Sequence, residues 1–530
     1  MQQMNDGDSD GSEISSVWSD EDQGSDSSFE APQHKQKKMF VPLALSVCKS
    51  TPASSKSVKG RDGTVWRVCQ PGEQSAEQHF LKVQPDLMGP TAHAKDNIKD
   101  AASAFLCLLD MKILEHIRDC TVAEAHSVEE DKSWDLSIAE LKAFIALLYA
   151  RGVYGKNMDF ESFWSQEWGL PFFRSTIPRD RFREIMRYLR FEKKQDQHTQ
   201  QFNDKFAPMS FVWDRFVNNS IACYQPGSCI TVDKQPPGTS VRPGCTQKDK
   251  QKTNDIKFMI AADTETKYFL NGIPYLGSDK DLGEGVVMNL VEPFLGKGRN
   301  VTIKKCFTSL SLAKKLQQKN TSLVGVINQL KPELPSSVRQ RAKLYSTKVL
   351  KHDQATLTVY QSRKRESVVL LSTMHPTVSL CSDRQRTPET VIFHDDTKAG
   401  VDALDQMAHL YSVKNLTPRR LTAVFYNLLD IAGVNAYILL KACTSTPIPR
   451  RAFSLQLAKE LRQELMSTKT SVQMINLELA QEPGIKKHCQ VNSHCRKNTT
   501  VVSCTGCQRP MCGKCTIKVE HLCHMCALLL

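Results

Sequence analysis

Eight of the chain's 18 cysteines lie between positions 489 and 526, where their spacing points to metal binding. They form four pairs: Cys489 and Cys495, Cys504 and Cys507, Cys512 and Cys515, and Cys523 and Cys526. Thiolates in C-x2-C pairs are typical Zn²⁺ ligands, and eight of them match about two tetrahedral sites. We therefore predict a Cys-rich zinc domain at residues 486–530, in which structural Zn²⁺ supplies much of the folding free energy. The spacing leaves open whether the two sites interleave, and whether His488, His494, His521 or His524 replaces a cysteine.

A second group of candidate binding residues is a run of arginines after Pro178. An apolar stripe with the spacing of one helix face predicts a helix there, formed by Phe182, Ile185, Met186 and Leu189. The arginines occupy the other faces, at Arg179, Arg181, Arg183, Arg187 and Arg190. Guanidinium groups in this arrangement suit the phosphate backbone of DNA. A solvated helix face fits the same pattern.

The elements that must position these groups change character along the chain. A helical region is predicted from about Asn97, and its clearest helix starts at Ser137, which has capping-box spacing to Glu140. Short β-prone runs follow at 229–232, 256–262, 268–270, 301–303 and 321–327, with a helical stretch near 310–316. Residues 343–372 alternate as in a small β-rich unit, and helices return over about 397–442. Strands followed by helices predict a mixed α/β domain.

Charge and composition narrow the class of partner. The 530 residues predict two to four domains, and the formal net charge is +13. Residues 1–30 hold nine acids and no Lys or Arg, so the rest of the chain is more basic still. This positive charge favours nucleic acid as a partner, although a basic soluble protein without such a partner has the same composition. We expect no secretory signal, reduced cysteines and no membrane span. The most apolar stretch, 424–440, contains Asn427, Asp430 and Asn435 and predicts a buried helix.

Several segments, in order, resemble those of piggyBac transposases. They include Asn271-Gly-Ile-Pro-Tyr-Leu-Gly277, Gly400-Val-Asp-Ala-Leu-Asp-Gln-Met407, Arg179-Asp-Arg-Phe182, and Asn203-Asp-Lys-Phe-Ala-Pro208 followed by Trp213-Asp214. The resemblance runs from about residue 97 to the C-terminus. It implies a multi-domain α/β protein with a helical N-terminal dimerisation and DNA-binding region. It further implies a ribonuclease H-like catalytic-type domain with a β-rich insertion, and a C-terminal zinc-binding Cys-rich domain.

The resemblance also implies a catalytic site of converging carboxylates, which hold Mg²⁺ for phosphodiester chemistry. Asp233 matches the first catalytic aspartate, Asp402 the third, and Asp405 a nearby supporting acid. The second position is occupied by Lys304, and no Asp or Glu occurs anywhere from Pro293 to Pro332. A cation in place of an anion beside a dication costs on the order of 10 kcal/mol. We therefore expect Mg²⁺ not to bind and Lys304 to pair instead with Asp233 or Asp402.

These observations predict a nuclear, transposase-derived protein that binds double-stranded DNA without cutting it. Two alternatives remain open: a residually active metal-dependent transposase or nuclease, and a chromatin or protein-interaction module acting through the zinc tail. A homodimer is a further possibility that the resemblance raises. The expected boundaries are a disordered acidic tail at 1–38, a linker at 39–96, helices at 97–228, and the ribonuclease H-like domain at 229–450. Its insertion is expected at about 331–380, followed by a helical linker at 451–485 and the zinc domain at 486–530.

Overall fold

The computed structural model describes most of the chain between Lys56 and Cys523. The described residues are 56–73, 88–129, 132–155, 160–193, 205–235, 256–275, 283–414, 417, 419–445, 447–479, 487–495, 497–505, 507–517 and 522–523. The predicted acidic tail at 1–38 lies outside them, as do Pro236, Pro237, His521, His524 and Cys526. Cys523 is described by its backbone alone.

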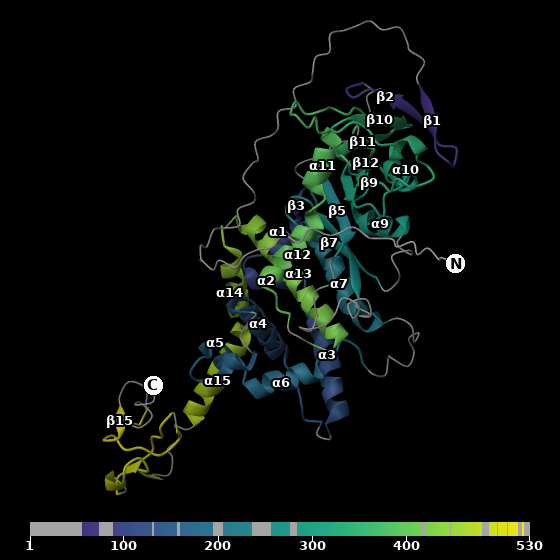
Figure 1. Cartoon of the computed structure of the whole chain (residues 1–530). Helices are drawn as coiled ribbons and strands as arrows, with labels where there is room; N and C mark the ends of the chain where they lie inside the picture. Colours follow the sequence, from purple (N-terminus) through teal and green to yellow (C-terminus); the bar gives the residue numbers. More distant parts are fainter. Residues whose placement is uncertain are drawn as a thin grey trace, which may run out of the picture. The chain divides into compact units, whose positions relative to one another are not determined.

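A ten-stranded mixed sheet organises the described part of the chain, with strands in the order β1-β2-β10-β11-β12-β9-β8-β5-β6-β7 (Figure 1). One half consists of β5 (Cys229–Lys234), β6 (Lys257–Asp263), β7 (Phe269–Tyr275), β8 (Asn300–Ile303) and β9 (Ser322–Val326). β5, β6 and β7 form an antiparallel meander, whereas β8 runs parallel to β5 and to β9. This is the ribonuclease H-like arrangement that the resemblance implied, and each of its strands overlaps a predicted β-prone run.

The β-rich unit expected near 343–372 forms the other half of the sheet. β10 (Thr347–His352), β11 (Ala355–Arg363) and β12 (Glu366–Ser372) are antiparallel, and β12 pairs with β9. Two further strands, β1 (Ser57–Lys59) and β2 (Val65–Cys69), extend the sheet beyond β10. They fall within the segment expected to be a linker, so that expectation does not hold for 57–69. Trp66 is fully buried and donates from Nε1 to the Glu333 carbonyl at 2.8 Å, a partner 267 residues away that local sequence does not reveal.

The helical region begins at α1 (Ala92–Asn97), slightly before the predicted start. It continues through α2 (Ala101–Leu106), α3 (Met111–Val128), α4 (Ile138–Tyr154), α5 (Pro171–Thr176), α6 (Arg179–Tyr188) and α7 (Ala207–Cys223). Ser137 caps α4 as predicted, because its side chain accepts a hydrogen bond from the Glu140 amide. A short 3-10 helix, η2 (Phe160–Trp164), and a two-strand pair, β3 (Gly89–Pro90) with β4 (Tyr224–Gln225), complete the region.

Helices flank the sheet and join it to the helical region. These are α9 (Glu284–Val291), α10 (Leu310–Gln318), α11 (Glu389–Thr397), α12 (Gly400–Leu410) and α13 (Arg420–Thr444). Helix α13 is long and apolar enough to cross a membrane, but 89% of its apolar window is buried inside the protein. It packs against α2, α7 and α12, so it is the buried core helix that its polar residues predicted (Figure 1).

The remaining helices and strands lie toward the C-terminus. α14 (Arg450–Leu461) packs against α4 and buries Phe453, Leu457 and Leu461, so it belongs to the core rather than to the helical linker expected at 451–485. α15 (Gln463–Leu479) follows it. The Cys-rich tail contains two short antiparallel pairs, β13 (Lys487–His488) with β14 (Thr499–Thr500), and β15 (Thr516–Ile517) with β16 (Leu522–Cys523).

Candidate active site and Cys-rich metal site

Two parallel strands bring Asp233 and Lys304 to the same edge of the sheet. In the pairing of β5 with β8, Val232 lies opposite Ile303, so Asp233 and Lys304 are the next residues on neighbouring strands. The carboxyl ends of such strands are where polar groups can converge while the strands themselves stay apolar and buried. Here β8 is buried throughout, and Asp233 is only 4% exposed.

Helix α12 brings the third residue, Asp402, to this edge. The helix packs against β5 so closely that a Cβ on Gly400 would lie 2.5 Å from the Thr231 hydroxyl oxygen. Only glycine fits at such a contact. Gly400 therefore permits α12 to approach β5 closely. This approach places Asp402, in the first turn of α12, beside the strand ends.

The ammonium group of Lys304 contacts both carboxylates. Its Nζ forms an ion pair with Asp233 and lies 3.2 Å from Asp402 Oδ2 and 3.4 Å from Oδ1. The ion pair expected from sequence is confirmed, with both candidate partners rather than one. A further hydrogen bond comes from the Lys234 amide to Asp233 Oδ1 at 2.8 Å.

Burial and pairing shift the pKa values of this pair. Burial is the largest influence on Asp233 and raises the pKa of its carboxyl group, although Lys304 opposes the change. For Lys304, burial by itself lowers the pKa, but the hydrogen bonds and charges of Asp233 and Asp402 outweigh it, so the pKa is raised. Lys304 therefore carries its positive charge at neutral pH.

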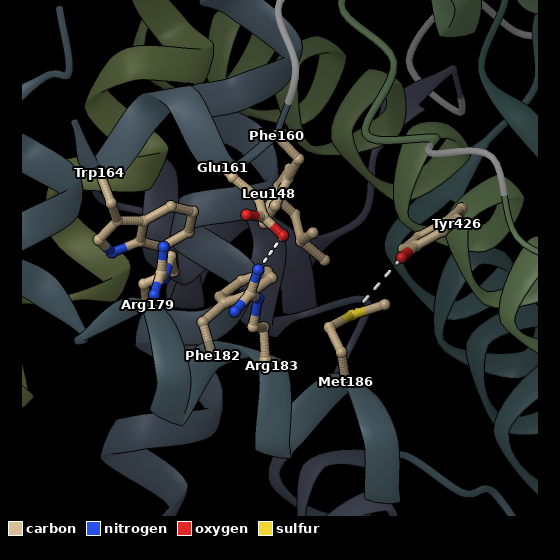
Figure 2. A pocket seen from close by; sticks show the side chains of 9 residues that line it. All are labelled: Leu148, Phe160, Glu161, Trp164, Arg179, Phe182, Arg183, Met186 and Tyr426. Carbon is tan, nitrogen blue, oxygen red and sulfur yellow. Dashed lines mark hydrogen bonds and ion pairs between the residues drawn. The ribbon is translucent and has the colours of Figure 1, made fainter.

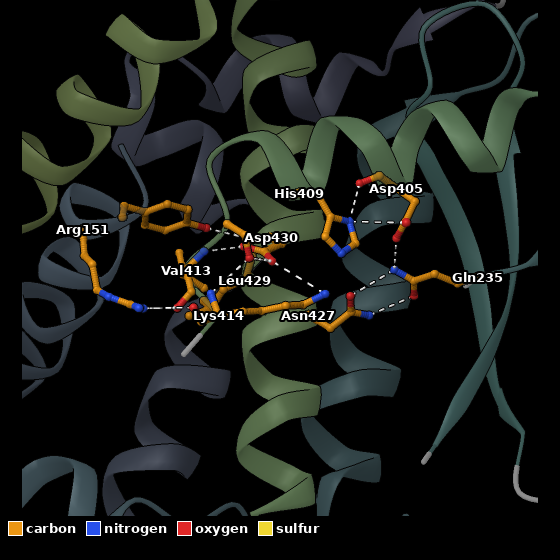
Figure 3. A network of polar contacts seen from close by, with 11 residues as sticks. Arg151, Gln235, Asp405, His409, Val413, Lys414, Asn427, Leu429 and Asp430 are labelled. Atoms are coloured by element: carbon orange, nitrogen blue, oxygen red, sulfur yellow. Dashed lines mark hydrogen bonds and ion pairs between the residues drawn. The ribbon is translucent and has the colours of Figure 1, made fainter. Parts of the chain in front are cut away.

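Asp405 does not join this group but belongs to a neighbouring polar network (Figure 3). Its Oδ1 accepts a hydrogen bond from Gln235 Nε2 at 3.0 Å, and its Oδ2 lies 3.3 Å from His409 Nδ1. Gln235 and Asn427 exchange hydrogen bonds through their side-chain amides at 3.0 and 2.9 Å. Burial raises the pKa of Asp405, but His409 and Gln235 outweigh it and the net pKa is lowered.

Gln235, Asn427 and His409 were not predicted to be parts of the site. A signal for Gln235 was present, since residues two apart on a strand share a face, and it follows Asp233 at that spacing. For His409, the four-residue spacing from Asp405 on one helix was also readable. Nothing local indicates Asn427, which comes from α13, 192 residues beyond Gln235.

The residues present do not fit a pair of Mg²⁺ ions. A two-metal site needs several carboxylates that face the ions without a competing cation between them. In this site the Lys304 ammonium lies against both Asp233 and Asp402, the carboxylates that would hold the ions, and Asp405 is bonded elsewhere. The expectation that Mg²⁺ does not bind here therefore has a geometric basis.

The five arginines predicted to bind DNA lie on and just after α6, and each is near a carboxylate. Arg181 has two carboxylate partners, Glu140 at 2.8 Å and Glu184 at 3.2 Å, and its guanidinium carbon lies 4.5 Å from the centre of the Trp134 ring. Arg190 is 2.7 Å from Glu124, and Arg187 is 3.5 Å from Glu129. Arg179 and Arg183 contact Asp180, and Arg183 also pairs with Glu161.

Two of these arginines, Arg179 and Arg183, line a pocket of about 340 Å³ (Figure 2). Its other walls come from α4, η2, α6 and α13, and include Phe160, Trp164, Phe182 and Tyr426. In Figure 2 the Glu161 carboxylate points toward Arg183, in agreement with their ion pair. The structure thus gives these arginines local structural partners, and their role in DNA binding stays a prediction.

In the Cys-rich tail, sulfur atoms from two distant cysteine pairs gather at one point. Cys489, Cys512 and Cys515 have Sγ atoms within 4.8 Å of one another. Cys515 Sγ lies 3.8 Å from each of Cys489, Cys512 and Cys495 Sγ. Tetrahedral Zn–S bonds of about 2.3 Å place sulfur atoms about 3.8 Å apart, so this spacing fits the ion.

Backbone and side-chain donors support the same sulfur atoms. The Cys512 amide donates to Cys489 Sγ and the Asn498 side-chain amide to Cys512 Sγ, both at 3.4 Å. Hydrogen bonds of this kind favour the thiolate, the form that binds metal. The group therefore has the cysteine ligands of a metal site and the hydrogen bonds that stabilise them as thiolates. It draws on the first and third cysteine pairs and omits the second pair, Cys504 and Cys507.

A ribonuclease H-like sheet with carboxylates at the end of β5 and on a helix packed against it defines a chain of the DDE-transposase class. A family model described as "Transposase IS4" matches residues 100–437, and the chain belongs to this family. Within it, the chain is of the piggyBac type. It is 25% identical to the protein in "Cryo-EM structure of piggyBac transposase synaptic complex with hairpin DNA (SNHP)", with a TM-score of 0.66. The match covers 83% of this chain and 99% of that one. None of the curated proteins matches.

Proposed function

We propose that this piggyBac-type protein binds double-stranded DNA in the nucleus without cutting it. The observation that carries the proposal is the position of Lys304 Nζ against Asp233 and Asp402. A cation there repels the metal ions that phosphodiester chemistry requires. The ion pair also supplies the charge balance that the carboxylates would otherwise lack, so the fold persists without metal.

DNA as the partner is supported by charge and by family. The net charge of +13 favours a polyanion, and the solved piggyBac transposase of similar fold is in a complex with hairpin DNA. Asp233, Asp402 and Asp405 then act as ion-paired and hydrogen-bonded groups.

The Cys-rich tail is proposed to hold two Zn²⁺ ions in interleaved sites. Cys489, Cys495, Cys512 and Cys515 supply one site, as their 3.8 Å sulfur contacts support. Cys504, Cys507, Cys523 and Cys526 remain for the other. Zinc in these sites would fix a segment too short to build a substantial apolar core.

The experiment that tests the proposal separates binding from cleavage. A labelled duplex and a DNA hairpin are incubated with the full chain in Mg²⁺, in Mn²⁺ and in a chelator. We expect a salt-sensitive complex under all three conditions and no nicked product under any. Metal-dependent nicking that Asp233→Ala abolishes would overturn the proposal, and so would failure to bind either DNA.

A further inference from the structure

Three loops at one end of the β-rich insertion carry an unusual concentration of positive charge. They are the segment before β10 (339–346), the turn between β11 and β12 (363–366), and the turn before α11 (383–386). Against two acids, Glu366 and Asp383, they hold eight exposed basic side chains. The eight, called here the basic tip, are Arg339, Arg341, Lys343, Arg363, Lys364, Arg365, Arg384 and Arg386.

Contacts around the C-terminal end of β11 bring the three loops together. The Tyr345 amide donates to the Gln361 carbonyl at 2.9 Å, and the Gln361 amide donates to the Ser346 carbonyl at 3.1 Å. The Tyr360 hydroxyl donates to the Gln385 carbonyl at 2.9 Å, which ties the third loop to the same strand. The side chains of Tyr345 and Tyr360 also pack in one apolar cluster. The loops are therefore held by strand and cluster contacts, and the charges project from a fixed base.

The charges of the basic tip are largely uncompensated. In the part of the chain that the structure describes, Arg363 alone among the eight has an ion-pair partner, Glu366 at 3.3 Å. The arginines of the α6 region differ, since each of those has a carboxylate within 4.0 Å. A guanidinium that is already paired must give up its partner to bind a phosphate, whereas an unpaired one exchanges only water and counterions.

We propose that the basic tip is a contact surface for the phosphate backbone of duplex DNA. The inference rests on the proposed DNA-binding function, and it specifies which surface makes a major part of the electrostatic contact with DNA. Arg and Lys side chains on short loops suit phosphates, which they bind without reading base edges, so the tip contributes affinity and not sequence preference. Counterion release from the neutralised phosphates drives this contact.

The test compares two variants of the full chain that each lose three positive charges. One is Lys343→Gln, Lys364→Gln and Arg365→Gln in the basic tip. The matched control is Lys99→Gln, Lys112→Gln and Lys459→Gln, three exposed lysines on or beside α1, α3 and α14. Affinity for a duplex of mixed sequence, about 40 base pairs long, is measured from about 50 to 200 mM salt, with thermal unfolding as a check that both variants fold.

The basic-tip variant is expected to bind about 10-fold more weakly near 0.1 M salt, with a log–log salt slope shallower by about 2. The control is expected to retain the wild-type slope. Equal slopes in both variants, with intact wild-type binding, would overturn this inference alone. A wild-type chain that does not bind the duplex at all would overturn the proposed function together with it. A loss that varies with DNA sequence would contradict the assignment to backbone contacts.

Discussion

The Lys304 ammonium joins the loop after β8 to Asp233, which lies at the end of β5. Asp233 is only 4% exposed. The same ammonium reaches Asp402 on α12, so a single side chain fixes three elements that are distant in sequence. Removing it leaves a buried carboxylate without its counter-charge.

Lys304→Ala is expected to destabilise the protein by about 1–3 kcal/mol at neutral pH. Breaking a fully buried pair costs more, but Lys304 is 42% exposed and water screens part of the interaction. Urea unfolding measures the change. The adjacent Lys305 is exposed and serves as the control, since Lys305→Ala is expected to leave stability nearly unchanged. Equal stability of the two variants would contradict the structural role of Lys304.

Gly400 and Gly285 give a second, sterically defined pair of substitutions. Gly400→Ala is expected to cost about 1–3 kcal/mol, because its Cβ would lie 2.5 Å from Thr231 Oγ1 and push α12 from β5. A Cβ added at Gly285, inside α9, would have no neighbouring atom within 4 Å, so Gly285→Ala is expected to stabilise by about 0.5–1 kcal/mol. Opposite signs in thermal unfolding confirm the close packing of α12, and a neutral Gly400→Ala would refute it.

Local patterns predicted much of this fold because the relevant contacts are local. Ser137 and its capping partner are three residues apart, and the β-prone runs of the meander follow one another along the chain. The strands at 57–69 were not predicted, because the burial of Trp66 depends on β10 and Glu333, which lie far along the chain.

The candidate site divides in the same way. The Lys304 ion pair could be expected, because the resemblance to piggyBac transposases places Lys304 at the catalytic position between Asp233 and Asp402. The separation of Asp405 from that pair could not, since it depends on Gln235 and on Asn427 from α13. Some carboxylates that pair with the α6 arginines, such as Glu124, lie up to 66 positions away, so the helix pattern by itself did not reveal them.

Cysteine substitutions test how the metal ligands are shared. Purified full-length chain is expected to contain about two zinc ions, and Cys515→Ser about one, because Cys515 lies at the centre of the sulfur contacts. Cys507→Ser is expected to remove the other ion. The double variant with Cys515→Ser and Cys507→Ser is expected to bind neither. Elemental analysis gives the counts. If Cys515→Ser kept its full zinc content, the assigned grouping would be wrong.

Asp430 in the core helix α13 predicts a specific pH dependence of stability. Burial raises its pKa to about 6, against the opposing effects of Lys414, Ser412 and the Val413 amide. The folded state thus holds the proton more tightly than the unfolded state, so this group's contribution falls as pH rises from about 4 to about 6. The loss is on the order of 3 kcal/mol.

The neutral variant Asp430→Asn isolates this effect, because it retains the shape of the side chain and cannot ionise. Its stability relative to the wild type is expected to be greater at pH 7 than at about pH 4.5, as measured by urea unfolding at the two pH values. The comparison between proteins cancels the titration of other groups. A difference that stays constant across this range would show that Asp430 has no raised pKa.

The strongest test of the proposed loss of cleavage is to reverse the charge at position 304. The wild-type chain is expected to show no Mg²⁺- or Mn²⁺-dependent nicking of a DNA hairpin, because Lys304 lies where the ions would bind. Lys304→Asp restores a third carboxylate beside Asp233 and Asp402, so divalent ions should then raise its thermal stability. Cleavage should recover far less, since a misplacement of about 1 Å can cost 100-fold in rate. The neighbouring Lys234 also remains a cation beside the site. Full cleavage by Lys304→Asp would show that Lys304 alone accounts for the proposed loss of cleavage, and cleavage by the wild type would refute that proposal.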